Sequence, residues 1–164
     1  TKALDAYPKL KVIMTYPNAD DGGRKIIPLI EAYAEKYRNR IKVVPSLGQR
    51  RYLSAVKHAK VVIGNSSSGI IEVPSFHVPT VNIGARQLGR LASKSVINSV
   101  ATEEGIQQAI QKAIELSESG TVQSFTNPYG QGNASAQILN LIRTSDLKIV
   151  KQFYDLVIQQ ERDL

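Results

Sequence analysis

The residues Val61-Val62-Ile63-Gly64-Asn65-Ser66-Ser67-Ser68-Gly69 give the clearest indication of the fold class. A short run of β-branched apolar residues passes into a small polar turn bounded by two glycines, and an apolar run that begins at Ile70 follows. Val and Ile favour strands, and a continuous apolar run is typical of a strand buried on both faces of a parallel sheet. This stretch therefore predicts a strand, a turn and a helix in an α/β protein.

Short apolar runs alternate with helical patterns along the rest of the chain, which predicts a doubly wound, Rossmann-like parallel sheet. We assign residues 1–144 to this domain and residues 145–164 to a C-terminal helix. Strands are expected at 11–15, 41–44, 61–63, 80–83 and 95–97. Helices are expected at 24–37, at 48–56, at 70–76 where Pro74 must shorten or distort the helix, from Thr102 through Ile114, at 133–143 with Asn133 as N-cap, and at 145–161, and a loop is expected at 117–131. Thr102 is expected to cap the helix that follows it, whose apolar stripe at helical spacing consists of Ile106, Ala109, Ile110, Ala113 and Ile114.

The charge of the chain is concentrated in its first half. The 164 residues carry a net charge of +7. Residues 1–82 contain 13 Lys and Arg against 6 Asp and Glu, whereas residues 83–164 contain 8 of each. A basic half suggests an anionic partner. The basic residues are dispersed, however, and no aromatic residues interleave with them, so we expect no nucleic-acid platform.

Several classes of protein are disfavoured by composition. The chain has no cysteine, which excludes disulfides and thiolate metal sites and fits a reducing cytoplasm. No apolar run approaches the length of a membrane helix, and no signal-peptide pattern is present. His58 and His77 are isolated in the sequence, and we interpret both as structural. We expect no metal, no cofactor and no membrane partner.

The residues of the serine-rich turn are compatible with two interpretations, a phosphate site and a helix cap. The N–H groups at the start of a helix have no internal acceptors, and the helix dipole favours an anion there, so phosphate is a natural ligand. Gly64 and Gly69 would allow close backbone approach. The turn could equally be an ordinary run of helix-capping residues. It is neither a Walker A motif nor a GxGxxG motif, so no NTPase or NAD function follows.

Two more candidates lie near this turn. Arg86 follows the next strand, and consecutive strand ends can share one edge of a doubly wound sheet, so Arg86 could reach a phosphate above the turn. It could also be a plain surface arginine. Glu72 could accept hydrogen bonds from ribose hydroxyls, or it could be an acid favoured by the helix start.

The segment from Thr15 to Arg24 is a strand end followed by turn residues. Its acidic pair, Asp20 and Asp21, lacks the other positions of a calcium-binding loop, so we expect no metal there. No acid–base pair, activated nucleophile or metal cluster emerges anywhere in the chain. The residues thus indicate a binding domain for a phosphorylated ligand, with the chemistry performed elsewhere.

Three ordered motifs lie at residues 64–72, 79–90 and 129–135. Together they resemble the carboxy-terminal half of UDP-N-acetylglucosamine 2-epimerases. The opening motif Tyr16-Pro17-Asn18-Ala19-Asp20-x-Gly22-Gly23 looks like the hydrolysing branch of that family, in place of the His-Arg-Arg-Glu-Asn of the non-hydrolysing branch. The terminal stretch 151–156 is also similar to bacterial hydrolysing members.

The resemblance implies a fold and a set of roles. The family has two Rossmann-like domains of the glycosyltransferase-B type with the UDP-sugar between them, and this chain would be the second domain. Ser66 and Ser67 match positions that hold the diphosphate, and Arg86 matches the arginine that neutralises it. Glu72 matches a ribose-binding glutamate, and the backbone at Val44 matches a uracil-binding position. The supporting loop residues would be Gly64, Asn65, Gly69 and Asp20.

By the same resemblance, the family reaction removes the C2 proton, expels UDP and then adds water, which gives N-acetylmannosamine for sialic acids. The partners would be the UDP-sugar, a missing N-terminal domain and, in the full-length enzyme, further copies in a homo-oligomer. The catalytic residues would lie in that missing domain, so we expect none in this chain and no turnover by the chain alone. Two alternatives stay open: an epimerase for a UDP-2,4-diacetamido sugar of the legionaminic type, and a non-catalytic module for another anion or a nucleic acid.

Overall fold

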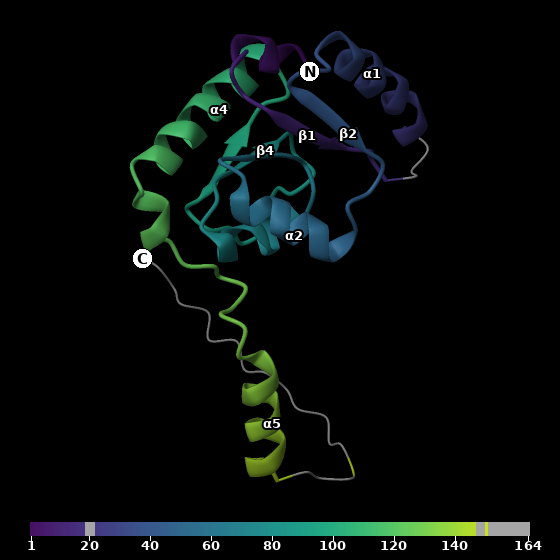
Figure 1. The fold of residues 1–164 in the computed structure, drawn as a ribbon. Helices are drawn as coiled ribbons and strands as arrows, with labels where there is room; N and C mark the ends of the chain where they lie inside the picture. Colours follow the sequence, from purple (N-terminus) through teal and green to yellow (C-terminus); the bar gives the residue numbers. More distant parts are fainter. Residues whose placement is uncertain (19–21, 147–149, 151–164) are drawn as a thin grey trace, which may run out of the picture. The chain divides into compact units, whose positions relative to one another are not determined.

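Helices and short parallel strands alternate in the computed structural model, which describes residues 1–18, 22–146 and 150 (Figure 1). The chain separates into two compact units, Thr1–Tyr129 and Gly130–Leu164, and every strand in the described residues belongs to the first. The elements in chain order are η1 (Lys2–Ala6), β1 (Val12–Thr15), α1 (Gly23–Lys36), β2 (Ile41–Val44), α2 (Gly48–His58), β3 (Val62–Gly64), α3 (Ser68–Ile71), η2 (Val73–Phe76), β4 (Thr80–Ile83), β5 (Val96–Ser99), α4 (Glu103–Glu118), η3 (Thr121–Ser124) and α5 (Ala134–Thr144), where η denotes a 3-10 helix.

The strands form two parallel sheets, β1-β2 and β3-β4-β5. The carboxyl ends of paired strands come together in both: Thr15 lies opposite Val44, and Gly64 lies opposite Asn82. Parallel neighbours require crossover connections. Helix α1 lies between β1 and β2, and α3 and η2 lie between β3 and β4, whereas residues 84–95 join β4 to β5 as a loop. The predicted α/β, Rossmann-like class is therefore confirmed, including the strands at 41–44 and 80–83, and the predicted fifth strand runs one to two residues later than expected.

One face of the β3-β4-β5 sheet packs against α4. Val81 of β4 joins Ala109, Ile110 and Ala113 of α4 in a fully buried cluster. These three α4 residues belong to the apolar stripe that the sequence predicted at helical spacing. Ile97 of β5 packs against the same cluster. The stripe thus faces the sheet, as its period required.

The opposite face of this sheet packs against the segments that surround β3. Val62 points away from the α4 face, because side chains alternate along a strand, and it packs against the buried residues Val56 of α2 and Val73 of η2. Thr80 of β4 lies on the same face, where its hydroxyl donates to the Gly69 carbonyl of α3 at 2.9 Å. Helical segments therefore cover both faces, which is the doubly wound arrangement.

The expectation that residues 61–63 form a strand buried on both faces is wrong at Ile63, which is 38% exposed. The strand β3 lies at the end of its sheet, with β4 as its only neighbour in the described part of the chain. An edge strand lacks the flanking strand that would complete its cover. The apolar run correctly predicted a strand, but it could not predict that this strand lies at the edge of the sheet.

Pro74 breaks the predicted helix at 70–76 into two short pieces. The single α-helical turn α3 ends at Ile71, and the 3-10 turn η2 begins at Val73. Proline has no N–H to donate to the preceding turn, so the α-helical ladder cannot run through it. His77 ends η2 in the left-handed region at φ 54°.

Of the two predicted N-caps, Thr102 is confirmed and Asn133 is wrong. Thr102 caps α4 as predicted, because its hydroxyl accepts from the Gly105 N–H at 3.1 Å. Asn133 precedes α5, but its side chain makes no capping hydrogen bond. Its backbone has ψ 10°, outside the extended region from which a side chain normally reaches the first turn.

The predicted loop at 117–131 begins later, because α4 continues to Glu118, and it contains the turn η3. The helix predicted at 145–161 lies largely outside the described residues.

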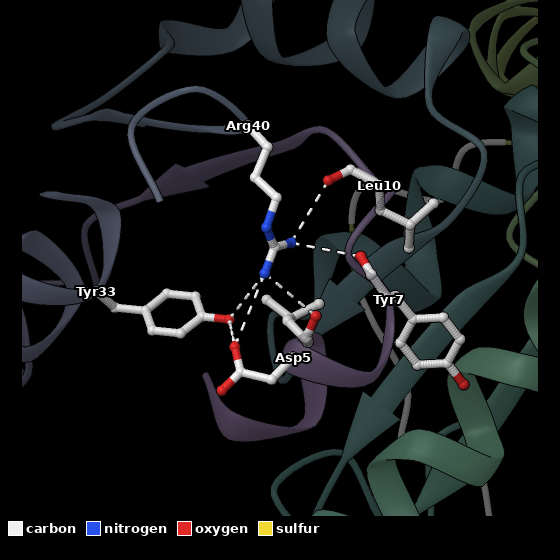
Figure 2. Close-up of polar contacts among 6 residues, drawn as sticks. Asp5, Tyr7, Leu10, Tyr33 and Arg40 are labelled. Atoms are coloured by element: carbon white, nitrogen blue, oxygen red, sulfur yellow. Dashed lines mark hydrogen bonds and ion pairs between the residues drawn. The ribbon is translucent and has the colours of Figure 1, made fainter. Parts of the chain in front are cut away.

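Arg40, the residue before β2, connects η1 to α1 and to the start of β2 through polar contacts (Figure 2). Its side chain is only 10% exposed, and its guanidinium lies 3.8 Å from the Asp5 carboxylate. The Tyr33 hydroxyl of α1 donates to Asp5 at 2.6 Å. The Arg40 guanidinium also donates to the carbonyls of Leu4, Tyr7 and Leu10 at 3.4, 3.4 and 3.5 Å.

The same cluster changes the acidity of two side chains. Burial and the hydrogen bond to Asp5 raise the pKa of Tyr33 to about 12. The hydrogen bond from Tyr33 lowers the pKa of Asp5 below its ordinary value. The Tyr7 hydroxyl, from the same N-terminal segment, donates to the Gln107 carbonyl of α4 at 2.8 Å. The N-terminal segment therefore contacts α4, α1 and Arg40.

Candidate functional site

The serine loop, residues Asn65–Ser67, joins the carboxyl end of β3 to α3. Asn65 and Ser66 are exposed, and Ser67 is half-buried. The Ser66 carbonyl accepts from the Gly69 N–H at 3.1 Å, and the Ser67 carbonyl accepts from the Ile70 N–H at 3.0 Å. The loop is thus a tight turn that leads directly into α3.

Two N–H groups of this turn have no acceptor in the described part of the chain. Neither the Ser66 nor the Ser67 N–H donates to an acceptor among residues 1–18, 22–146 and 150. The Ser68 N–H, by contrast, donates to the Ser66 hydroxyl at 3.3 Å. Adjacent unpaired N–H groups on an exposed turn can bind an anion.

The helix that follows contributes less than the sequence suggested. The helix α3 has four residues, and a macrodipole is a sum over aligned peptide units. One turn sums few of them. Any attraction for an anion must therefore come mainly from the local N–H groups and from neighbouring cationic side chains.

Arg86 and Gln87 reach the serine loop from the segment after β4. The Arg86 Nη1 donates to the Asn65 carbonyl at 3.1 Å, and the Gln87 Nε2 donates to the same oxygen at 2.8 Å. Because β3 and β4 are parallel neighbours, the segments that follow them leave from the same edge of the sheet. The structure therefore brings Arg86 and the serine loop together, as the sequence analysis anticipated.

The two glycines around the loop differ in what surrounds them. A Cβ on Gly69 would lie 2.8 Å from the Thr80 Cγ2, so this glycine permits the close packing of α3 on β4. A Cβ on Gly64 would meet no atom within 4 Å, and Gly64 does not have a positive φ. The protein's own packing therefore requires a glycine at position 69 and not at position 64.

The other predicted binding residues lie at different places. Glu72 is half-buried and lies between α3 and η2, where its side chain caps neither. Glu72 follows the last residue of α3 and directly precedes η2, so it is not an acid in the first turn of α3. Val44 is half-buried at the carboxyl end of β2, followed by Pro45. Asp20 lies outside the described residues.

Three residues that the sequence analysis did not select also hold this region. Gln87 is one, and it is 6% exposed. The Tyr52 hydroxyl of α2 lies 2.7 Å from the Ser68 hydroxyl. The Asn127 amide donates to the Ile71 carbonyl at 2.8 Å. Each is a polar residue in a helix or loop that reads as surface, so no sequence signal separated it from its exposed neighbours.

The remainder of the described surface offers few other sites. One open hollow is lined by Tyr7 and by Gln107, Gln111 and Glu115 of α4, and another lies over α1 and β2; neither includes the serine loop. No group of three His, Asp or Glu side chains that could hold a metal ion occurs in the described residues. Among those residues, no helix combines the length and apolar character needed to cross a membrane.

This geometry defines a class: a Rossmann-like α/β domain with an exposed serine turn and an arginine at the carboxyl edge of its sheet. Comparison with known proteins gives the family. The sequence model of the UDP-N-acetylglucosamine 2-epimerase family matches residues 1–143. The chain therefore belongs to the UDP-N-acetylglucosamine 2-epimerase family, which has the glycosyltransferase-B-like fold.

Individual relatives are bacterial. The chain is 41% identical over 111 residues to the GDP/UDP-N,N'-diacetylbacillosamine 2-epimerase (hydrolyzing) of Campylobacter jejuni, which covers 68% of this chain and 28% of that protein. It is 37% identical over 142 residues to the polysialic acid biosynthesis protein P7 of Escherichia coli, covering 85% and 36%. It is 31% identical over 147 residues to the UDP-N-acetylglucosamine 2-epimerase of Neisseria meningitidis, covering 88% and 38%. The chain thus spans about a third of the length of these relatives.

Proposed function

We propose that this chain is the UDP-binding part of a hydrolysing UDP-N-acetylglucosamine 2-epimerase, and that the serine loop holds the diphosphate of the nucleotide sugar. One observation carries the proposal: the unused N–H groups of Ser66 and Ser67 lie on the loop that Arg86 contacts. Hydrogen-bond donors and a guanidinium together suit a diphosphate. The absence of any Cβ contact at Gly64 adds support, because the protein's own packing does not require glycine there.

The proposed reaction eliminates UDP from the sugar. A base removes the C2 proton, the bond between C1 and the diphosphate oxygen breaks, and a C1–C2 double bond forms as UDP leaves. Water then adds across that double bond, which releases the free sugar with C2 inverted. Negative charge develops on the diphosphate as the bond breaks, so donors on the serine loop and Arg86 would stabilise the transition state.

The other predicted residues would bind the nucleoside. Glu72 would accept hydrogen bonds from the ribose hydroxyls, the backbone at Val44 would contact the uracil, and Asn65, Gly69 and Asp20 would support the loop. The residues that move protons would lie in the part of the enzyme outside this chain, so the chain alone would not turn over substrate. The hydrolysing branch is supported by the 16–23 motif and by the name of the Campylobacter relative, a hydrolyzing 2-epimerase.

A second substrate is favoured by a specific observation. Two relatives, from Campylobacter jejuni and Legionella pneumophila, carry the name diacetylbacillosamine 2-epimerase. A UDP-2,4-diacetamido sugar would present the same diphosphate to the serine loop, so the residues of this chain do not separate the two substrates. Product analysis of the complete enzyme with each UDP-sugar decides between them: inverted N-acetylmannosamine supports the first, and inverted diacetamido sugar the second.

Nucleotide binding by this chain is tested by calorimetric titration with UDP. Arg86→Ala should weaken UDP binding by about tenfold or more, since hydrogen bonds to charged groups contribute roughly 1.5–3 kcal/mol. Arg90→Ala is the matched control, because Arg90 is an exposed arginine four residues away in the same segment. Equal losses in the two variants would contradict a specific role for Arg86 and favour a general basic surface that also binds other polyanions.

A further inference from the structure

We propose that Gln87 is a positioning residue for the serine loop. Its side chain holds the Asn65 carbonyl in place while Arg86 leaves that carbonyl to bind the anion. This inference rests on the proposed function, because the anion is taken to be the diphosphate. It assigns separate roles to two adjacent residues that now share one acceptor. Gln87 would be the permanent donor and Arg86 the exchangeable one.

Burial separates the two donors. Gln87 is 6% exposed, whereas Arg86 is exposed. Only the NH2 end of an amide can donate to a carbonyl, so the Gln87 amide must point its nitrogen at Asn65. Its Oε1 is then buried and has no hydrogen-bond partner in the described part of the chain. A buried, unsatisfied oxygen is unfavourable. An apolar side chain of the same size would avoid that cost, so the donation from Nε2 is the feature that requires an amide here.

The shared acceptor explains why two donors are needed. A carbonyl oxygen has two lone pairs, and the Asn65 oxygen uses them for Arg86 and Gln87. If Arg86 swings toward a ligand, the carbonyl still has the Gln87 amide. The loop then keeps its backbone orientation, because the Asn65 carbonyl still accepts one hydrogen bond from the protein. A guanidinium has five N–H donors, and this one lies on an exposed side chain that can move.

The orientation of the Asn65 carbonyl also sets the direction of a neighbouring donor. A trans peptide unit is planar, so the N–H of Ser66 points opposite to the carbonyl of Asn65. Because Arg86 and Gln87 lie on the carbonyl side, the Ser66 N–H points away from both. An anion bound at this N–H can be reached by Arg86 only after Arg86 leaves the carbonyl. Gln87 would therefore fix the Ser66 donor and permit that movement.

Gln87→Met tests this arrangement, because methionine has a similar size and no N–H. Without ligand, the variant should move the backbone amide signal of Ser66 in the NMR spectrum. With UDP, a double-mutant cycle is decisive. In the wild-type background, Arg86→Ala should weaken UDP binding about tenfold. In the Gln87→Met background the same change should weaken it only about twofold, because Arg86 would there stay on the Asn65 carbonyl as its only donor and would contribute little to UDP binding. Multiplicative losses would overturn the proposal, because a merely structural role gives independent effects.

Gln87→Glu provides a second readout if the Met variant does not fold. An ionised carboxylate cannot donate to the Asn65 carbonyl, whereas a protonated carboxyl can. The affinity of this variant for UDP, divided by that of the wild type at the same pH, should therefore rise as the pH falls. Gln108→Glu, an exposed glutamine of α4, is the control and should show a flat ratio. A flat ratio for Gln87→Glu as well would overturn the proposal.

The two hypotheses fail in different ways. If the wild type binds no UDP, the proposed function is wrong, and the ligand-free Ser66 signal in Gln87→Met still reports whether Gln87 positions the loop. If the wild type binds UDP while Gln87→Met leaves the Ser66 signal unmoved, the function stands and the role of Gln87 is wrong.

Discussion

Gly69→Ala should destabilise the protein through one identifiable clash. The added Cβ would lie 2.8 Å from the Thr80 Cγ2, whereas carbon atoms pack favourably at about 3.5–4.0 Å. Thr80 is buried in β4 and is 2% exposed, so its methyl group has little room to move. Overpacking of this kind costs about 1–3 kcal/mol, and alanine recovers up to about 1 kcal/mol of helix propensity in α3. The expected net loss is about 1–2 kcal/mol.

Thr80→Ser supplies the compensating change. Serine removes the Cγ2 methyl and keeps the hydroxyl that donates to the Gly69 carbonyl at 2.9 Å. The methyl group introduced at position 69 would then occupy the space of the lost one. Gly69→Ala should therefore cost about 1–2 kcal/mol less in the Thr80→Ser background, within the range of coupling energies for residues in contact. Chemical denaturation followed by circular dichroism measures the free energy of unfolding of all four proteins.

Gly64→Ala is the matched control for this cycle. A Cβ there meets no atom within 4 Å, and the backbone of Gly64 does not have a positive φ. Its free energy of unfolding should stay within about 0.5 kcal/mol of the wild type. Additive effects of Gly69→Ala and Thr80→Ser, or a wild-type stability for Gly69→Ala, would show that α3 does not pack on β4 as described.

Three more predictions address the core, a cap and a titration. Ile110→Ala, at a fully buried position of α4, should cost about 2–5 kcal/mol in unfolding free energy, and a loss below about 1 kcal/mol would refute its place in the core. Thr102→Ala removes the cap on the Gly105 N–H and should cost about 0.5–2 kcal/mol, whereas Thr102→Asp should retain most of the stability. The pKa of Tyr33 is raised from 10.0 to about 12, so the unfolded chain releases this proton first and stability falls as the pH rises between those values. The tyrosinate absorbance of Tyr33→Phe should lack a group that ionises near pH 12; loss of a group that ionises near pH 10 instead would contradict the described bond to Asp5.

Local patterns were sufficient for much of the fold. The strands at Ile41–Val44 and Thr80–Ile83 were predicted at their observed bounds, because each is a short apolar run stopped by a turn residue or proline. The α4 stripe and its Thr102 cap were also predicted, since both depend on spacing within one element. The exposure of Ile63 could not be predicted, because it depends on the place of β3 at the edge of a sheet.

The site was predictable only where strand topology decided it. Parallel strands place the segments that follow them at one edge, so the meeting of Arg86 with the serine loop followed from the strand assignments. Gln87 was missed, because a glutamine in a glycine-bounded loop reads as exposed, and its burial depends on how the segment after β4 folds back. The short α3 was anticipated through Pro74, but the resulting loss of helix dipole at the loop was not.

The most direct test of the proposed site is an NMR titration of this chain with UDP and, separately, with uridine. UDP should shift the backbone amide signals of Ser66 and Ser67 and the side-chain signal of Arg86, because the diphosphate would bind those groups. Uridine, which has no phosphate, should leave these three signals in place. Unchanged signals at millimolar UDP, or equal shifts with uridine, would contradict the assignment of the serine loop as the diphosphate site.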